Sequence, residues 1–152
     1  AGNAYEAEYL FQQGFEQVYV LDIAKQPLEK FQERVPDFPA TQLLHENFFE
    51  HQGQYDIIVE QTFFCSFLPT KENRQTYATK MHELLKVDGK LVGLWFKFPI
   101  DANGGRRPFG GSLAEYLTYF EPLFEVESFE EAKNSIPPRM GKELFGVMRK
   151  TT

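Results

Sequence analysis

The chain has 152 residues, 42% of them hydrophobic, and a formal net charge of −6. This length can bury a core without disulfides, and its lysines and arginines form no basic stripe of the kind that binds nucleic acid. A single cysteine, Cys65, excludes an internal disulfide and fits a reducing compartment. No apolar run approaches the ~20 residues that span a bilayer, and no signal-like segment opens the chain. We therefore expect a cytoplasmic protein without nucleic-acid or membrane partners.

The spacing of hydrophobic residues predicts helices and strands in alternation along the chain. Helices are expected over residues 4–13, 26–35, 71–86 and 112–120. Strands are expected over residues 17–22, 41–46, 55–60, 90–98, 124–130 and 143–149.

Local signals mark where several of these elements begin or end. Gly14 is placed to stop the first helix, and Pro27 is tolerated in the first turn of the second. Thr70 and Ser112 are of the type that caps a helix N-terminus. Asp88-Gly89 predicts a turn between the third helix and the strand that follows it.

The order of elements predicts an α/β fold with a mostly parallel sheet and helices on both faces. The apolar run at residues 55–60 is typical of a strand covered on both sides. The last two strands have no helix between them, and the loop containing NSIPPR is too short for a parallel crossover. We therefore expect the last strand to run antiparallel to its neighbours.

The first twenty-two residues carry the pattern of a nucleoside-binding site. Gly2 at a strand-to-helix turn would let the backbone approach a ligand, and Asp22 at the end of the next strand could accept both hydroxyls of a ribose. The same two residues also fit an ordinary turn and an ordinary strand end. A dinucleotide fingerprint needs a third small residue where this chain has Tyr5. The pattern therefore favours S-adenosylmethionine, and with it methyl transfer, over a dinucleotide cofactor.

Longer motifs resemble the thiopurine S-methyltransferase family, most closely its halide and thiol methyltransferase branch. They follow the family's order over nearly the whole chain and include TFFC (62–65), LLKVDGKL (84–91) and NSIPPRMGKE (134–143). The resemblance implies a class I, Rossmann-like methyltransferase with a seven-stranded sheet whose last strand is antiparallel. It also implies that residues 1–152 form a single domain, N-terminally incomplete, because the family's first strand and an aromatic lid segment would precede residue 1.

The resemblance also implies roles for residues that would bind S-adenosylmethionine. Gly2 would lie beside the methionine part of the cofactor and Asp22 would bind the ribose. Asn47 and Phe48 occupy positions where the family usually has Asp-Phe, which contacts adenine. Gln61, after Glu60, stands where the halide branch commonly has a tyrosine, so the methyl acceptor is less certain than the cofactor.

Candidates for the acceptor pocket are Phe63, Phe64 and Arg139, although the two phenylalanines equally fit a core. Cys65 fits a small buried group better than a nucleophile. The three histidines have no ligand spacing, so we expect no metal site. Arg106 and Arg107 fit a solvated loop better than an acceptor site.

The expected reaction is the in-line transfer of a methyl group from S-adenosylmethionine to a small sulfur or halide acceptor. A soft anion needs no general base, so the protein would align it and exclude water. Three alternatives stay open: a thiopurine-like, oxygen or nitrogen acceptor; a cofactor-binding protein without catalysis; and a nucleotide-dependent oxidoreductase. No catalytic residue is assigned, and the oligomeric state is left open.

Overall fold

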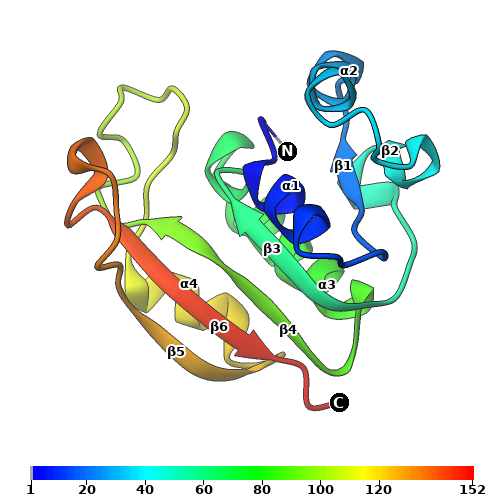
Figure 1. Ribbon diagram of the computed structural model, residues 1–152. Coiled ribbons are helices and arrows are strands. Elements are labelled where there is room, and N and C mark those ends of the chain that lie inside the picture. Colours follow the sequence, from blue (N-terminus) through cyan, green and yellow to red (C-terminus); the bar gives the residue numbers. More distant parts are fainter. Residues whose placement is uncertain (1) are drawn as a thin grey trace. The chain divides into compact units, whose positions relative to one another are not determined.

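The computed structural model describes residues 2–152, which form two compact units divided between His51 and Gln52. The first unit holds two helices and a two-stranded parallel sheet, labelled in Figure 1. Its elements are α1 (Tyr5–Gln12), β1 (Val20–Asp22), α2 (Lys25–Arg34) and β2 (Leu43–His45).

A small hydrophobic core holds the first unit together. Val20 from β1 and Leu28 and Phe31 from α2 are buried in it together with Phe38 from the loop that follows. The rings of Phe31 and Phe38 meet edge to face, with their centroids 4.9 Å apart. Residues of α1 pack at the margin of this core, since none of that helix is fully buried.

Both strands of the first unit are shorter than the predicted ranges 17–22 and 41–46. The side-chain amide of Gln42 donates to the carbonyl oxygens of Glu16 and Val18. The backbone just before β1 therefore pairs with a side chain and not with a neighbouring strand. Residues Ala40–Gln42 form a 3-10 turn before β2 begins. The predicted helices agree with α1 and α2 to within one residue at each end, and Gly14 has the positive φ of a helix stop.

The second unit is built on a four-stranded sheet in the order β3-β4-β6-β5. Its elements are β3 (Tyr55–Gln61), α3 (Lys71–Leu84), β4 (Leu85–Phe96), α4 (Leu113–Phe120), β5 (Glu125–Glu131) and β6 (Glu143–Arg149). β3 and β4 are parallel, whereas β6 runs antiparallel to both β4 and β5. The prediction of an antiparallel last strand is therefore confirmed.

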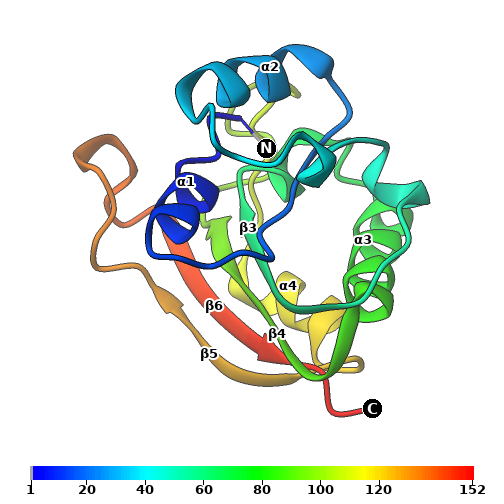
Figure 2. The same cartoon turned by 45° about the vertical axis from the view of Figure 1, so that its right-hand side comes forward.

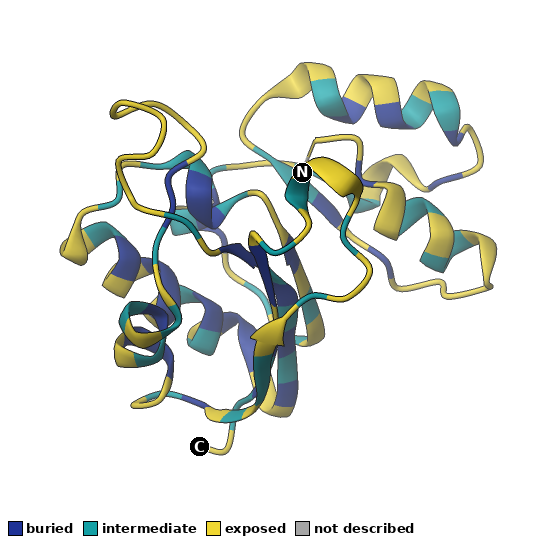
Figure 3. Cartoon of the chain, turned by 90° about the vertical axis from the view of Figure 1, so that its left-hand side faces the viewer, coloured by how far each residue is buried: buried dark blue, intermediate teal, exposed yellow. Residues whose placement is uncertain are grey.

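Helices α3 and α4 pack side by side against this sheet (Figures 1 and 2). The buried positions of this unit concentrate along the strands and the inner faces of the two helices (Figure 3). On β3, Glu60 is buried while Ile57 and Val59 are exposed, so the expectation of a strand covered on both sides is wrong for the described structure. Ile57 and Val59 alternate with Ile58 and Glu60, so they lie on the other face of the strand, which the described residues leave exposed.

The third helix ends two residues earlier than predicted, at Leu84. Leu85 already pairs with Tyr55 as the first residue of β4, and its side chain is fully buried. The ammonium group of Lys150 donates to the carbonyl oxygens of His82 and Leu85, which satisfies groups at the helix end. The predicted Asp88-Gly89 turn persists as an irregularity within β4, where Asp88 has a φ of 69°.

Residues 2–152 contain six strands. The seventh strand, expected before residue 1, stays a prediction, as do the coverage of both sheet faces by helices and the single-domain organisation of the whole chain.

Candidate functional site

The candidate cofactor residues of the first unit meet at the carboxyl ends of its two parallel strands. Asp22 is the last residue of β1 and pairs in register with His45, the last residue of β2. The backbone N–H of Glu46 donates to the carbonyl oxygen of Asp22 at 3.1 Å. Asn47 and Phe48 follow directly, so the predicted ribose and adenine residues lie on adjacent segments at one edge of the sheet.

The Asp22 carboxylate is held by backbone N–H groups. The N–H of Ala24 donates to Oδ1 at 2.8 Å. Burial alone would raise the pKa of Asp22, and the N–H groups of Ala24 and Gly2 are among the groups that lower this pKa below its usual value. The carboxylate is therefore ionised at neutral pH, and Gly2 lies next to it.

Asn47 has a structural role that the sequence did not indicate. Its side-chain oxygen accepts the N–H of Phe49 at 2.9 Å and caps the 3-10 turn Phe48–Glu50. Phe48 is buried, and its ring meets that of Phe49 edge to face. A carbonyl oxygen has two lone pairs, so this cap is compatible with a further donor at Asn47.

Gly2 adopts a φ of 56°, a conformation that favours glycine. A Cβ atom at this position would meet no atom within 4 Å. A hollow next to this turn is lined by Gly2, Asn3, Gln26, Pro27, Lys30 and Arg34. The need for glycine here is thus conformational and not one of space within the described residues.

In the second unit, the turn after β3 is organised by a buried carboxylate. Glu60 accepts the backbone N–H of Phe63 on one oxygen, at 3.1 Å, and that of Phe64 on the other, at 2.7 Å. The hydroxyl of Tyr77 on α3 donates to the second oxygen at 2.8 Å. Burial raises the pKa of Glu60, against the opposing effect of these three donors. Glu60 therefore fixes the conformation of the segment that carries Gln61, Phe63 and Phe64.

The two candidate acceptor phenylalanines lie differently in this turn. Phe64 is buried against the rings of Tyr77 and Tyr116, at centroid distances of 4.9 and 5.4 Å. Phe63 is partly exposed, and Gln61 is exposed. A small hollow beside the turn is lined by Thr62, Phe64, Cys65, Leu94, Trp95 and Phe96. Phe64 thus belongs both to an aromatic core and to the wall of this hollow.

Cys65 lies in the same turn and is not activated. Burial first, and then the Glu60 carboxylate, raise the pKa of its thiol from 9.0 to about 11. A buried thiol that is protonated at neutral pH is a poor nucleophile, in agreement with its predicted structural role.

Arg139 lies in the 3-10 turn Pro137–Arg139 between β5 and β6. Its guanidinium lies over the ring of Phe96, the last residue of β4, 5.4 Å from the ring centroid. Its Nη1 is 3.7 Å from the carboxylate of Glu143, which is buried. Arg139 is therefore placed at the carboxyl end of β4, beside a residue that lines the hollow next to Phe64.

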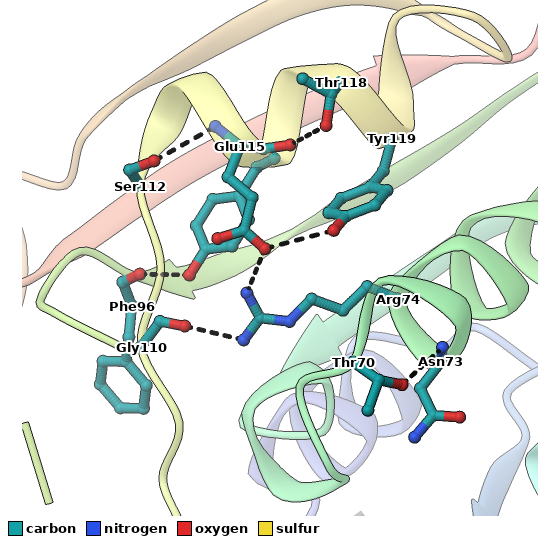
Figure 4. A network of polar contacts seen from close by, with 10 residues as sticks. Thr70, Asn73, Arg74, Phe96, Gly110, Ser112, Glu115, Thr118 and Tyr119 are labelled. Atoms are coloured by element: carbon teal, nitrogen blue, oxygen red, sulfur yellow. Dashed lines mark hydrogen bonds and ion pairs between the residues drawn. The ribbon is translucent and has the colours of Figure 1, made fainter. Parts of the chain in front are cut away.

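Sequence reasoning missed Arg74 of α3, the most deeply buried charge of this unit. Figure 4 shows its guanidinium between Gly110 and Glu115, and each of the two hydrogen bonds is 2.7 Å long. The signal that could have found it is its position: Arg74 precedes Tyr77 and Met81 by three and seven residues, so it lies in the buried stripe of the helix.

Residues 2–152 include neither a metal-binding cluster nor a helix that could span a membrane. No cluster of three or more histidine, cysteine, aspartate or glutamate side chains among them could hold a metal ion. None of the helices they form is both long and apolar enough to cross a membrane.

Comparison with known proteins decides the family. Residues 1–93 match the family described as a methyltransferase domain. The chain belongs to this methyltransferase family. Curated relatives include a probable thiol methyltransferase 2 of Arabidopsis thaliana, 35% identical over 87% of this chain, and a thiocyanate methyltransferase 1 of Brassica oleracea, 34% identical over 86%. The chain spans 59% and 58% of the lengths of these two relatives.

Solved methyltransferase structures share the fold. One is the 1,6-didemethyltoxoflavin-N1-methyltransferase of Burkholderia thailandensis, solved with S-adenosylhomocysteine bound, with a TM-score of 0.78 at 18% identity. The similarity covers 100% of this chain and 68% of that one. The N-methyltransferase NodS of Bradyrhizobium japonicum has a TM-score of 0.76 at 13% identity, over 100% of this chain and 82% of that one. The prediction of a class I, Rossmann-like methyltransferase fold is thus confirmed.

Proposed function

We propose that this methyltransferase uses S-adenosylmethionine to methylate a small sulfur or halide acceptor. The observation that carries the cofactor assignment is the placement of Asp22 beside Asn47 and Phe48 at the ends of parallel strands. Ligands of open α/β sheets bind at this edge. The acceptor class is supported by the thiol and thiocyanate methyltransferases to which the chain is similar.

The donor set fits a nucleoside cofactor. An ionised carboxylate at Asp22 would accept the ribose hydroxyls, and the buried ring of Phe48 would supply an apolar contact for adenine. Asn47 would accept the adenine amino group while it keeps its cap of the turn. Gly2 would leave room for close approach of the methionine part, since no atom lies near its Cβ position.

When bound, S-adenosylmethionine supplies a methyl carbon on a positively charged sulfur, open to in-line displacement by a soft nucleophile. A thiolate, thiocyanate or iodide already carries the attacking electron pair, so no side chain has to remove a proton. The turn after β3 agrees with a reaction that needs no general base. Burial keeps the Cys65 thiol protonated, and the Glu60 carboxylate already accepts three hydrogen bonds. The contribution of the aromatic side chains would be to exclude water and align the nucleophile.

A second acceptor class is favoured by one observation. Gln61, the last residue of β3, is exposed and offers an amide where the thiol and halide branch commonly has a tyrosine. A thiopurine-like, oxygen or nitrogen acceptor would use such a hydrogen-bonding group better than a halide would.

The test uses full-length protein with S-adenosylmethionine and, separately, iodide, thiocyanate and bisulfide. Headspace gas chromatography detects the methylated volatile product. We expect turnover with at least one acceptor and its loss in Asp22→Ala, where cofactor affinity should fall by roughly 1.5–3 kcal/mol because a charged hydrogen-bond acceptor is removed. The matched control Asp37→Ala removes an exposed carboxylate of the same unit and should leave turnover unchanged.

Other outcomes decide between the alternatives. Binding of S-adenosylhomocysteine without turnover of any of the three anions would direct the search to the larger acceptors or to a non-catalytic role. Binding of NADH and not of S-adenosylhomocysteine would overturn the proposal in favour of an oxidoreductase.

A further inference from the structure

Arg74 connects three segments of the second unit, one that follows β3 and two that follow β4. It lies on α3 with a fully buried side chain. Its Nη1 is 2.7 Å from Oε2 of Glu115 on α4, and its Nη2 donates to the carbonyl oxygen of Gly110 at 2.7 Å (Figure 4). The guanidinium also lies over the ring of Phe64, 4.6 Å from its centroid. One side chain therefore links the turn after β3, the end of the loop after β4, and α4.

The loop end that Arg74 contacts is itself joined to the turn after β3. The backbone N–H of Phe109 donates to the carbonyl oxygen of Cys65 at 2.8 Å. Gly110 is closely enclosed, because a Cβ atom there would lie 2.2 Å from the carbonyl oxygen of Phe98. These contacts join the Phe64–Cys65 peptide to the Phe109–Gly110 peptide, and the Arg74 guanidinium contacts both segments.

Stability alone does not account for an arginine at this position. Moving a guanidinium and a carboxylate out of water is costly, and apolar residues of similar volume often replace a buried ion pair without loss of stability. The Nε of Arg74 has no hydrogen-bond partner in the part of the chain that the structure describes, which adds to the cost. Apolar side chains cannot replace the rigid, planar guanidinium, whose N–H groups bind Gly110 and Glu115 at the same time.

We propose that Arg74 is a positioning residue that holds Phe64 and the Phe109–Gly110 peptide in place as one wall of the methyl-acceptor pocket. This inference rests on the proposed function, in which Phe64 lines that pocket. Arg74 itself touches no substrate; it acts through the ring and the loop that it contacts. Its loss should therefore weaken use of the acceptor and leave binding of the cofactor unchanged.

The decisive variant is the double substitution Arg74→Met with Glu115→Leu, which removes both charges and leaves neither buried alone. We expect it to fold with a melting temperature close to that of the wild type and to bind S-adenosylhomocysteine within about twofold of wild type. The KM for the acceptor should rise at least tenfold. Arg74→Lys keeps the positive charge but lacks the planar guanidinium, so we expect a KM between those of the wild type and the double variant. Arg149→Met, which removes a partly exposed arginine paired with Asp88, Glu125 and Glu127, is the control and should leave the KM unchanged.

Amide hydrogen exchange tests the positioning without any turnover. In the double variant the N–H of Phe109 should exchange at least tenfold faster than in the wild type, while amides of the β4–β6 ladder keep their protection. If wild-type protein methylates none of the anions, the proposed function fails, and the exchange of Phe109 alone decides whether Arg74 holds this wall.

Two results would overturn the inference. One is a double variant with wild-type exchange at Phe109 and a wild-type acceptor KM. That result would show that apolar side chains can replace the ion pair without any effect on the turn or the loop. The other is a loss of acceptor use and of S-adenosylhomocysteine affinity by the same factor, which would indicate general disruption of the fold.

Discussion

The candidate cofactor residues and the candidate acceptor turn are held by contacts of different range. In the first unit, Asp22 and Asn47 each accept a backbone N–H from two residues further along the chain. In the second unit, Glu60 is bonded to Tyr77, which is 17 residues away, and Arg74 to Glu115, which is 41 residues away. Side chains held by local contacts, such as Asp22 and Asn47, can be substituted without affecting the fold. Side chains held by distant partners, such as Glu60 and Arg74, are part of the fold.

The candidate cofactor residues and the residues that hold the acceptor turn also differ in burial. Asp22 and Asn47 are partly exposed, whereas Glu60 and Arg74 are buried, at 3% and 0% relative exposure. Substitutions at the partly exposed positions should therefore show first in ligand binding. Single substitutions at the buried positions leave a buried partner unpaired, so they should show first in the free energy of unfolding.

The largest expected effect is that of Glu60→Gln on stability. The carboxamide cannot accept on both sides as the carboxylate does, so at least one of the N–H groups of Phe63 and Phe64 or the hydroxyl of Tyr77 is left unpaired. We expect a loss of roughly 3 kcal/mol in the free energy of unfolding, measured by urea denaturation. Glu83→Gln, an exposed acid on α3, is the control and should cost less than about 0.5 kcal/mol. Equal stability of the two variants would contradict the role of Glu60 in the turn.

A smaller effect is expected from Cys65→Ala, as a change in the pH dependence of stability. The folded-state pKa of about 11 lies above the ordinary value of 9.0, so at pH 10 the unfolded chain has lost a proton that the folded chain keeps. Cys65 thus lowers the free energy of unfolding as pH rises from 9 towards 11. Between pH 9 and pH 10 this decrease amounts to about 1 kcal/mol.

Denaturation of wild type and Cys65→Ala at both pH values tests this expectation. Only the difference between the proteins is compared, so titration of the lysines and tyrosines cancels. Parallel pH dependences in the two proteins would show that the thiol is not shielded by the fold as described.

The smallest effect is expected at the cofactor end, from Asn47→Asp. Aspartate retains the oxygen that accepts the N–H of Phe49 and adds a charge for the adenine amino group. We expect S-adenosylhomocysteine to bind a few-fold more tightly, with stability unchanged within about 0.5 kcal/mol. Isothermal titration calorimetry measures the affinity, and an analogue with inosine in place of adenosine should not share the gain. Asn134→Asp, in an exposed loop, is the control.

The difference in contact range also explains what the sequence could predict. The caps at Thr70 and Ser112, the Gly14 stop and the antiparallel last strand follow from signals within a few residues, and the structure has all of them. The position of Asp22 at the end of β1 also agrees with the sequence, whereas its ribose-binding role stays a prediction. These are the features that local chemistry determines.

The structure departs from the sequence predictions where distant segments compete for the same groups. The side chain of Gln42 bonds to residues 16 and 18 and so shortens the predicted first strand. Leu85 pairs with Tyr55 and leaves the helix. The partners of Arg74 come from a loop and a helix that no local pattern connects to α3. Such contacts depend on the folded topology, which residue spacing alone does not specify.

The loop after β4 is fastened at its ends and unconstrained by packing in its middle. Phe98 bridges to Gly111, and Phe109 bonds to Cys65, whereas residues 100–107 are all exposed. A Cβ at Gly110 or Gly111 would collide with neighbouring atoms. One at Gly104 or Gly105 would meet nothing within 4 Å, so the preference for glycine at these two positions comes only from their positive φ. For protein engineering this divides the loop into a fixed frame and an exchangeable insert. A library confined to residues 100–107 can vary the length and charge of the loop while the frame that holds it is preserved.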